Sequence, residues 1–171
     1  MRKCFFLDRD GVIIKDRKNI YKIKDIFILP GVIEALKKIK KKNYLIIIIT
    51  NQSIIGRGKL SLEGFKKFTD HLNNLLFKNS KKKLIDDIFF CPHHPKKAIG
   101  NFKKICKCRK PGNKLLEDAI LKWNIDRKSS FMIGDRISDY LSAKKSKINF
   151  YYKNNSNFKD QVSSILNEKK L

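Results

Sequence analysis

Hydrophobic residues along the chain fall into short continuous runs that alternate with longer amphipathic stretches. Five runs have the length and the β-branched or aromatic content of buried strands: residues 4–7, 44–49, 85–90, 131–133 and 148–152. Five stretches carry apolar side chains at helical spacing: residues 32–42, 62–77, 113–123, 139–145 and 158–166. Because strand and helix alternate, we predict an α/β fold with a doubly wound parallel sheet and right-handed crossovers.

Length and composition bound the organisation of the chain. The 171 residues are 42% hydrophobic and 33% charged, which suits a folded protein rather than a disordered basic tail. Internal repeats are not visible, so we expect one domain over 1–171, with an inserted loop at 91–108 and a polar tail from about 154. No apolar run approaches the roughly 20 residues of a membrane span, and residues 1–10 lack the apolar core of a secretion signal. We therefore expect a cytoplasmic protein that has no membrane partner. Its small size and the absence of an apolar surface stripe favour a monomer.

The chain is strongly basic. Its 40 Lys and Arg residues against 16 Asp and Glu give a net charge of +24, whereas a small domain carries roughly 2 to 8 charges. A nucleic acid could explain this, but the Lys runs are scattered and no basic stripe with interleaved aromatic residues is evident, so we expect no specific nucleic-acid partner. Only seven of the 40 are arginines, and four of these fall in the motifs below: Arg9, Arg57, Arg109 and Arg136. Because the guanidinium fork suits phosphate oxygens, this placement hints at phosphate binding.

Polar residues with metal-binding chemistry follow the predicted strands. Asp8 and Asp10 come after the first strand, and Asp135 and Asp139 come after the fourth. Since the carboxyl ends of parallel strands lie at one edge of a sheet, these carboxylates should converge on an acidic pocket. Hard oxygen ligands of this kind suit Mg²⁺ with a bound phosphate.

Cationic and neutral groups are predicted to surround this pocket. Residues 50–53 supply hydrogen-bonding groups after the second strand, and Arg109 and Lys110 precede a helix, where they can face an anion. A metal site, a cationic clamp and a carboxylate free to attack make phosphoryl transfer through an aspartyl-phosphate chemically sensible. Simpler roles exist for single residues, because Asp8 could lie in a turn and Asp135 with Asp139 could cap a helix.

In order along the chain, four segments resemble the motifs of the haloacid dehalogenase superfamily: Asp8-Arg9-Asp10-Gly11-Val12, Thr50-Asn51, Lys110, and Gly134-Asp135 with Asp139. The resemblance implies a Rossmann-like phosphatase core without a large cap domain. It implies that Asp8 is the nucleophile and that Asp10 is the general acid and then the general base. Thr50 and Lys110 would hold the phosphoryl oxygens, and Asp139 would orient Lys110. The implied ligands of a catalytic Mg²⁺ are the Asp8 carboxylate, the Asp10 backbone carbonyl and Asp135.

A second metal site is predicted between the third strand and the following helix. Cys91, Cys106 and Cys108 share one irregular stretch with two histidines, and three thiolates with one imidazole make a closed tetrahedral zinc site. The stretch has too little apolar content to order itself, so we expect the zinc to be structural. The alternative is a set of free surface thiols. Cys4, inside the first strand, is expected to be a small buried hydrophobe.

Four longer motifs resemble the D-glycero-D-manno-heptose 1,7-bisphosphate phosphatase family: TNQSIIGRG, CPHHP, CKCRKP and GDRISD. The resemblance implies removal of the C7 phosphate of this phosphosugar during heptose supply for lipopolysaccharide, and it favours His93 over His94 as the zinc ligand. The implied contacts to the sugar or its distal phosphate are the segment Asp16 to Asn19 and Asn51, Gln52, Ser53, Arg57, Arg109 and Arg136. The chain departs from the family at Ile54, where a Gly is usual, and at residues 17–19.

Other functions stay open on the sequence. Histidinol-phosphate phosphatases share the acidic motifs and a zinc loop, but their segment between the histidine and the cysteine pair is shorter. The net charge also suits a nucleic-acid-binding or DNA-end-processing protein. A scaffold that has lost its activity would also keep the motifs.

Overall fold

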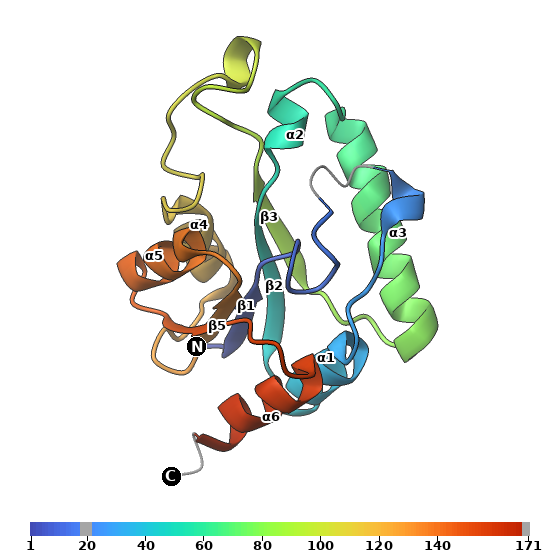
Figure 1. Ribbon diagram of the computed structural model, residues 1–171. Coiled ribbons are helices and arrows are strands. Elements are labelled where there is room, and N and C mark those ends of the chain that lie inside the picture. The colour runs from blue at the N-terminus through green and yellow to red at the C-terminus, as the bar shows by residue number, and fades with distance from the viewer. Residues whose placement is uncertain (18–21, 169–171) are drawn as a thin grey trace.

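A parallel sheet of five strands forms the centre of the computed structural model, which describes residues 1–17 and 22–168 (Figure 1). The strands are β1 (Cys4–Leu7), β2 (Leu45–Asn51), β3 (Asp87–Cys91), β4 (Phe131–Gly134) and β5 (Asn149–Tyr152). They lie in the order β3-β2-β1-β4-β5, and each neighbouring pair is parallel. The chain therefore winds outward in both directions from the β1/β4 boundary, which is where open α/β sheets bind their ligands.

Helices cover both faces of this sheet (Figure 1). The helices are α1 (Val32–Lys41), α2 (Ser53–Gly56), α3 (Leu62–Ser80), α4 (Lys114–Trp123), α5 (Ile137–Lys145) and α6 (Phe158–Glu168), with single 3₁₀ turns η1 (Ile23–Asp25) and η2 (Gly100–Phe102). Helices α1, α3 and α6 pack on one face, and α4 and α5 pack on the other. In the described residues, none of the helices is long and apolar enough to span a membrane.

Strand β2, which lies between β3 and β1, shows how the sheet is buried on both sides. Ile46 and Ile48 belong to the core beneath α1, α3 and α6, whereas Ile47 and Ile49 belong to the core beneath α4 and α5. Side chains of a strand alternate between faces, so an uninterrupted apolar run is what a doubly covered strand needs. The predicted fold class is confirmed.

Two local differences from the predictions lie next to the ends of β2 and β4. The polar residues after β2 lead into the short helix α2, because Ile54 and Ile55 bury their side chains against Phe65 of α3. Helix α5 begins at Ile137 rather than near 139. Its start is capped by Asp139, whose carboxylate accepts the Arg136 backbone N–H at 3.0 Å, while the Asp139 N–H donates to the Arg136 carbonyl at 2.9 Å.

Candidate active site

The Asp8 side chain stands at the carboxyl end of β1, next to β4. Its backbone N–H donates to the carbonyl of Ile133 at 3.0 Å, which continues the β1/β4 pairing by one residue. The Asp8 Oδ1 atom accepts the Arg9 backbone N–H at 2.7 Å and lies 3.1 Å from the Lys110 ammonium. These contacts fix the carboxylate at the β1/β4 boundary.

Lys110 links the ends of β1 and β2 to the first turn of α5 through a buried ammonium group. Its Nζ lies 3.1 Å from Asp8 Oδ1 and 2.5 Å from Asp139 Oδ1, and it donates to the Ile49 carbonyl at 2.8 Å. Its backbone is held by Asn51, whose Oδ1 accepts the Lys110 N–H at 3.0 Å and whose Nδ2 donates to the Lys110 carbonyl at 3.1 Å. Burial lowers the pKa of Lys110, but the two carboxylates outweigh it and raise the pKa above its usual value. The residue is therefore a fixed cation.

The carboxylates crowd together in a way that suits a divalent cation. Asp8, Asp135 and Asp139 each place an oxygen within 4.8 Å of the others. Burial raises the pKa of Asp8 to about 6, against the lowering effect of Lys110, and burial also raises the pKa of Asp135. Both oxygens of Asp139 already have partners, in Lys110 and the Arg136 N–H. Asp8 and Asp135 are therefore the carboxylates available to Mg²⁺, and these residues fit the ion.

The turn after Asp10 passes close to the carboxylate of Asp135. Gly11 has φ +88°, and a Cβ there would lie 2.3 Å from Asp135 Oδ2. Only glycine allows the backbone to pass Asp135 so closely and in this conformation.

A cavity of about 520 Å³ opens above these groups. Of the predicted catalytic and substrate-binding residues, eleven line it: Asp8, Asp10, Asp16, Thr50, Asn51, Gln52, Ser53, Arg57, Arg109, Lys110 and Arg136. Arg17, also expected near the sugar, is exposed and does not line the cavity. Asp16 is tied to Arg136, with Oδ2 and Nη2 2.6 Å apart. Lys18 and Asn19, also expected near the sugar, lie outside the described residues. The structure thus brings together side chains from five separate segments.

Residues that were not predicted as site residues also belong to the site. Lys97, Ser138 and Ile54, which the sequence marked only as a departure from the family, line the cavity, and the buried side chain of Arg9 binds Asp10 next to it. The sequence drew attention to Arg9, because it is one of few arginines and lies between two functional aspartates, but it gave Arg9 no role of its own. Lys97 gave no comparable signal, since it is one of many exposed lysines.

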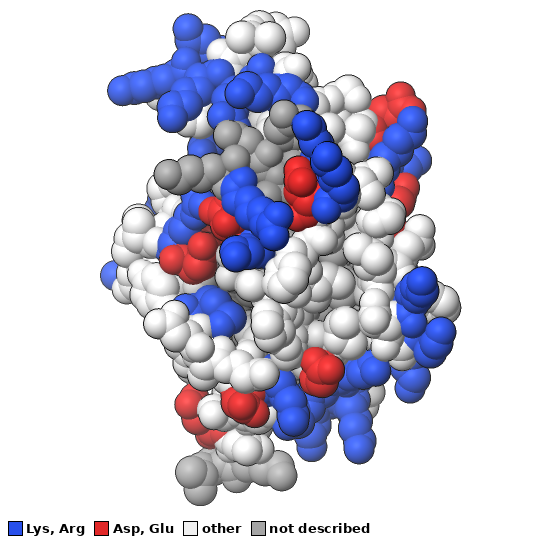
Figure 2. Space-filling model, turned by 45° about the vertical axis from the view of Figure 1, so that its right-hand side comes forward, with Lys and Arg blue, Asp and Glu red and all other residues white. Residues whose placement is uncertain are grey.

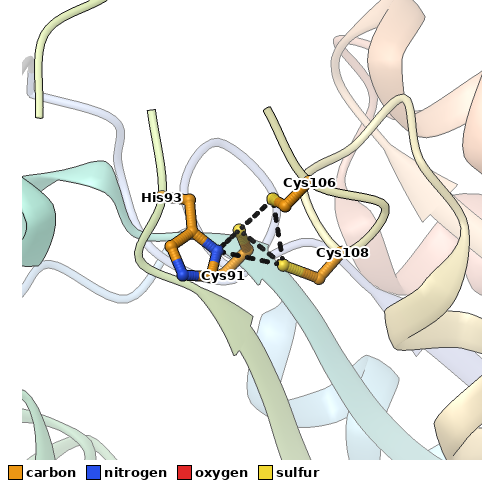
Figure 3. A group of neighbouring side chains, drawn as sticks. All are labelled: Cys91, His93, Cys106 and Cys108. Atoms are coloured by element: carbon orange, nitrogen blue, oxygen red, sulfur yellow. Dashed lines mark hydrogen bonds between the residues drawn. The ribbon is translucent and has the colours of Figure 1, made fainter. Parts of the chain in front are cut away.

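The four predicted zinc ligands meet at one point (Figure 3). Cys91 closes β3, and Cys106 and Cys108 reach it from the far side of the loop. The Cys108 sulfur lies 3.1 Å from each of the other two sulfurs and 3.3 Å from His93 Nδ1. These separations exceed the roughly 2.05 Å of a disulfide and match ligands that surround one ion.

The chemistry of this donor set fits zinc. Burial raises the pKa of the Cys91 thiol, so a bound cation is what would stabilise its thiolate. The neighbouring His94 is turned to another use, because its Nδ1 accepts the backbone N–H groups of Lys96 and Lys97. Cys4 is fully buried in the core, as expected for a small hydrophobe.

The positive charge does not form a single stripe. Figure 2 shows Lys and Arg side chains at the upper end, the middle and the lower end of one face, with Asp and Glu among them. One segment has a strong excess of positive charge, since residues 88–116 contain eight Lys and Arg and no Asp or Glu. This segment includes the cysteine loop beside the cavity, so the cavity's rim is cationic.

Comparisons with known proteins agree with this geometry. The family described as "Polynucleotide kinase 3 phosphatase" matches residues 3–164. The D-glycero-beta-D-manno-heptose-1,7-bisphosphate 7-phosphatase of Photorhabdus laumondii is 41% identical over 84% of this chain and 75% of its own. The alpha-named enzyme of the same organism is 43% identical over 85% and 79%.

Solved structures share the fold. The D,D-heptose 1,7-bisphosphate phosphatase of B. bronchiseptica, in complex with magnesium and phosphate, superposes with a TM-score of 0.79 at 21% identity, over 97% of this chain and 99% of that one. A haloacid dehalogenase-like phosphatase of Mesorhizobium loti gives a TM-score of 0.85 at 21% identity, over 96% of this chain and 86% of that one. The chain belongs to the D-glycero-D-manno-heptose 1,7-bisphosphate 7-phosphatase family of the haloacid dehalogenase superfamily.

Proposed function

We propose that the protein is a Mg²⁺-dependent phosphatase that hydrolyses the C7 phosphate of D-glycero-D-manno-heptose 1,7-bisphosphate. The observation that carries this proposal is the buried set of Asp8, Lys110 and Asp139 at the floor of a cavity with a cationic rim. Such a site attacks one phosphate and attracts a second. The relatives named above cover most of the chain, and their names are those of heptose bisphosphate phosphatases.

Asp8 is the nucleophile in this proposal. Both of its contacts use Oδ1, so Oδ2 attacks phosphorus while the bond from phosphorus to the C7 oxygen breaks. Asp10 donates a proton to the departing oxygen, which leaves an aspartyl-phosphate on Asp8. Asp10 then takes a proton from water as that water attacks phosphorus, and phosphate leaves with Asp8 restored.

Other residues hold the phosphoryl group during both steps. Lys110 and the Thr50 hydroxyl bind its oxygens, and Lys110 offsets the charge that builds up as phosphorus is attacked. Asp139 and Asn51 keep Lys110 in place from its two ends. Mg²⁺, held by Asp8, Asp135 and the Asp10 carbonyl, would supply further charge neutralisation at the phosphoryl oxygens.

The second phosphate is bound by the rim. Arg57, Lys97, Arg109 and Arg136 line the cavity from different segments, and Arg109 is fixed by donating to the His93 carbonyl at 3.1 Å. A bisphosphate can therefore place one phosphate on the floor and the other at the rim.

Three finer points belong to this proposal. A cytoplasmic location keeps the cysteine ligands reduced and available to zinc. The cavity is assembled within one chain, which is consistent with a monomer. The product would supply heptose for lipopolysaccharide.

Phosphate release by the zinc-loaded protein with Mg²⁺ tests the function. We would compare both anomers of the heptose bisphosphate, histidinol phosphate and a 3′-phosphorylated oligonucleotide, with Asp8→Asn as control. We expect a strong preference for the heptose and no turnover by Asp8→Asn. A preference for another substrate would overturn the assigned substrate, and activity of Asp8→Asn would overturn the mechanism.

A further inference from the structure

Arg9 is a buried arginine whose side chain does not reach the cavity. It is 2% exposed, and its guanidinium group lies near the rings of Phe68 and Phe65 of α3, with Cζ 4.8 Å and 5.8 Å from their centroids. A charge buried in this way needs a compensating partner. The partner is Asp10, whose two oxygens accept from Arg9 Nε at 2.9 Å and from Nη2 at 3.0 Å.

Gln52 closes this ion pair into a ring of hydrogen bonds. Arg9 Nη2 also donates to Gln52 Oε1 at 2.9 Å. The Gln52 Nε2 atom donates to Asp10 Oδ2 and to the Thr50 hydroxyl, both at 2.9 Å. Gln52 is 3% exposed, so it is held almost entirely by protein groups.

Arg9 settles which way the Gln52 amide points. A guanidinium group can only donate, so the atom that faces it must be the amide oxygen. The amide nitrogen is then directed at Asp10 and Thr50. Because Thr50 Oγ1 accepts this bond, its single hydroxyl proton is left to donate elsewhere, toward the cavity that Thr50 lines.

We propose that Arg9 and Gln52 are positioning residues that fix the Asp10 carboxyl group and the donor direction of the Thr50 hydroxyl for phosphoryl transfer. This inference rests on the proposed function, in which Asp10 transfers the protons and Thr50 binds a phosphoryl oxygen. Neither Arg9 nor Gln52 needs to touch the substrate. Their effect reaches the reaction through Asp10 and Thr50.

The role of Arg9 is tested by how the rate loss in Arg9→Lys depends on the leaving group of the substrate. A lysine ammonium is a point charge and cannot bind both Asp10 oxygens and Gln52 with one planar fork. We would measure kcat/KM for phenyl phosphate, whose leaving group needs a proton, and for p-nitrophenyl phosphate, whose leaving group needs it far less. We expect a loss of about 10²-fold for phenyl phosphate and a loss several times smaller for p-nitrophenyl phosphate.

Two reference variants make this result specific. Asp10→Asn removes the acid itself and should show the same split between the two substrates. Arg127→Lys alters another bidentate arginine, paired with Glu117 away from the cavity, and should leave both rates unchanged. Equal losses on both substrates, or no loss, in Arg9→Lys would overturn the proposal. If Asp10→Asn itself shows no split, the mechanism of the proposed function fails instead.

Gln52→Leu provides an independent test should Arg9→Lys fold poorly. Leucine removes both donors, so the Thr50 hydroxyl is no longer directed. We expect kcat/KM to fall on the order of tenfold for both aryl phosphates, with an unfolding midpoint close to that of the unaltered protein. Unchanged rates in Gln52→Leu would contradict the positioning role of Gln52.

Discussion

The carboxylate site and the cysteine loop lie near the same end of the sheet but are held in place in different ways. Lys110 is 3% exposed, and its ammonium and backbone bind groups at the ends of β1 and β2 and in the first turn of α5. In the cysteine loop, only Cys91 belongs to a strand. The apolar side chains of Ile99 and Ile105 in that loop are 62% and 90% exposed, so they stabilise it little.

This difference shows which site depends on its metal for shape. Side chains of the carboxylate site are positioned by strands and by direct hydrogen bonds, so Mg²⁺ would enter a prepared site. The loop's ligands converge on a point, and an ion at that point would supply the order that packing does not. The two sites meet at consecutive residues, because Arg109 and Lys110 directly follow Cys108.

Lys110→Met should break the prepared site and have the largest effect. It leaves the buried carboxylates of Asp8 and Asp139 without their cation, which costs about 3–5 kcal/mol in the free energy of unfolding. Activity should fall by about 10³-fold or more. Lys110 lowers the pKa of Asp8, so its removal should raise that pKa further, and the stability loss should shrink as falling pH protonates Asp8 and relieves the repulsion.

Denaturant unfolding across pH and phosphate-release assays check the Lys110→Met prediction. Lys40→Met is a matched control, since Lys40 of α1 pairs with Asp86 in a more exposed position and neither residue lines the cavity. It should keep full activity. A stable, active Lys110→Met protein would mean that the carboxylate site is not organised by this lysine.

Asn51→Leu should have the next largest effect, because Asn51 binds the backbone of Lys110 at both its N–H and its carbonyl. Losing these two bonds allows the ammonium to shift, and a shift of about 1 Å can cost on the order of 10²-fold in kcat. Thr50→Ser, on the same strand end, retains its hydroxyl and serves as a control with a small loss. An unchanged kcat in Asn51→Leu would show that the side-chain contacts of Lys110 suffice to place it.

Zinc removal should disturb the cysteine loop but not the carboxylate site, and it should lower kcat/KM about tenfold. A zinc-selective chelator in excess Mg²⁺ should free the loop, so that trypsin cleaves near Lys103, Lys104 and Lys107 while the sheet stays folded. Arg109 then loses its fixed position and KM rises, whereas Asn51 keeps Lys110 in place and kcat changes less. Circular dichroism measures whether the sheet keeps its secondary structure after chelation. Global unfolding on chelation would show that the loop is not a separate unit of stability.

Sequence alone predicted the parts of the molecule that follow from local patterns. Continuous apolar runs located the strands, and polar residues directly after them located the cavity, as Asp8 and Thr50 illustrate. The Asn51–Lys110 clamp was out of reach, because it joins residues 59 positions apart through bonds that only the folded chain creates. Helix α2 was missed for a similar reason, since its burial depends on α3. The extent of one domain over 1–171 stays a prediction.

Lys97→Gln should have the smallest effect and tests the rim of the loop. Lys97 lines the cavity, whereas its exposed neighbour Lys96 does not, so Lys96→Gln is a control with the same charge change in the same loop. Because an exposed cation is screened by water and salt, we expect KM for a bisphosphate to rise about two- to fivefold in Lys97→Gln only, with kcat unchanged. The difference should fade at high ionic strength. Equal effects of the two variants would mean that the loop acts through its overall charge, and then its zinc-ordered shape would not matter for binding the second phosphate.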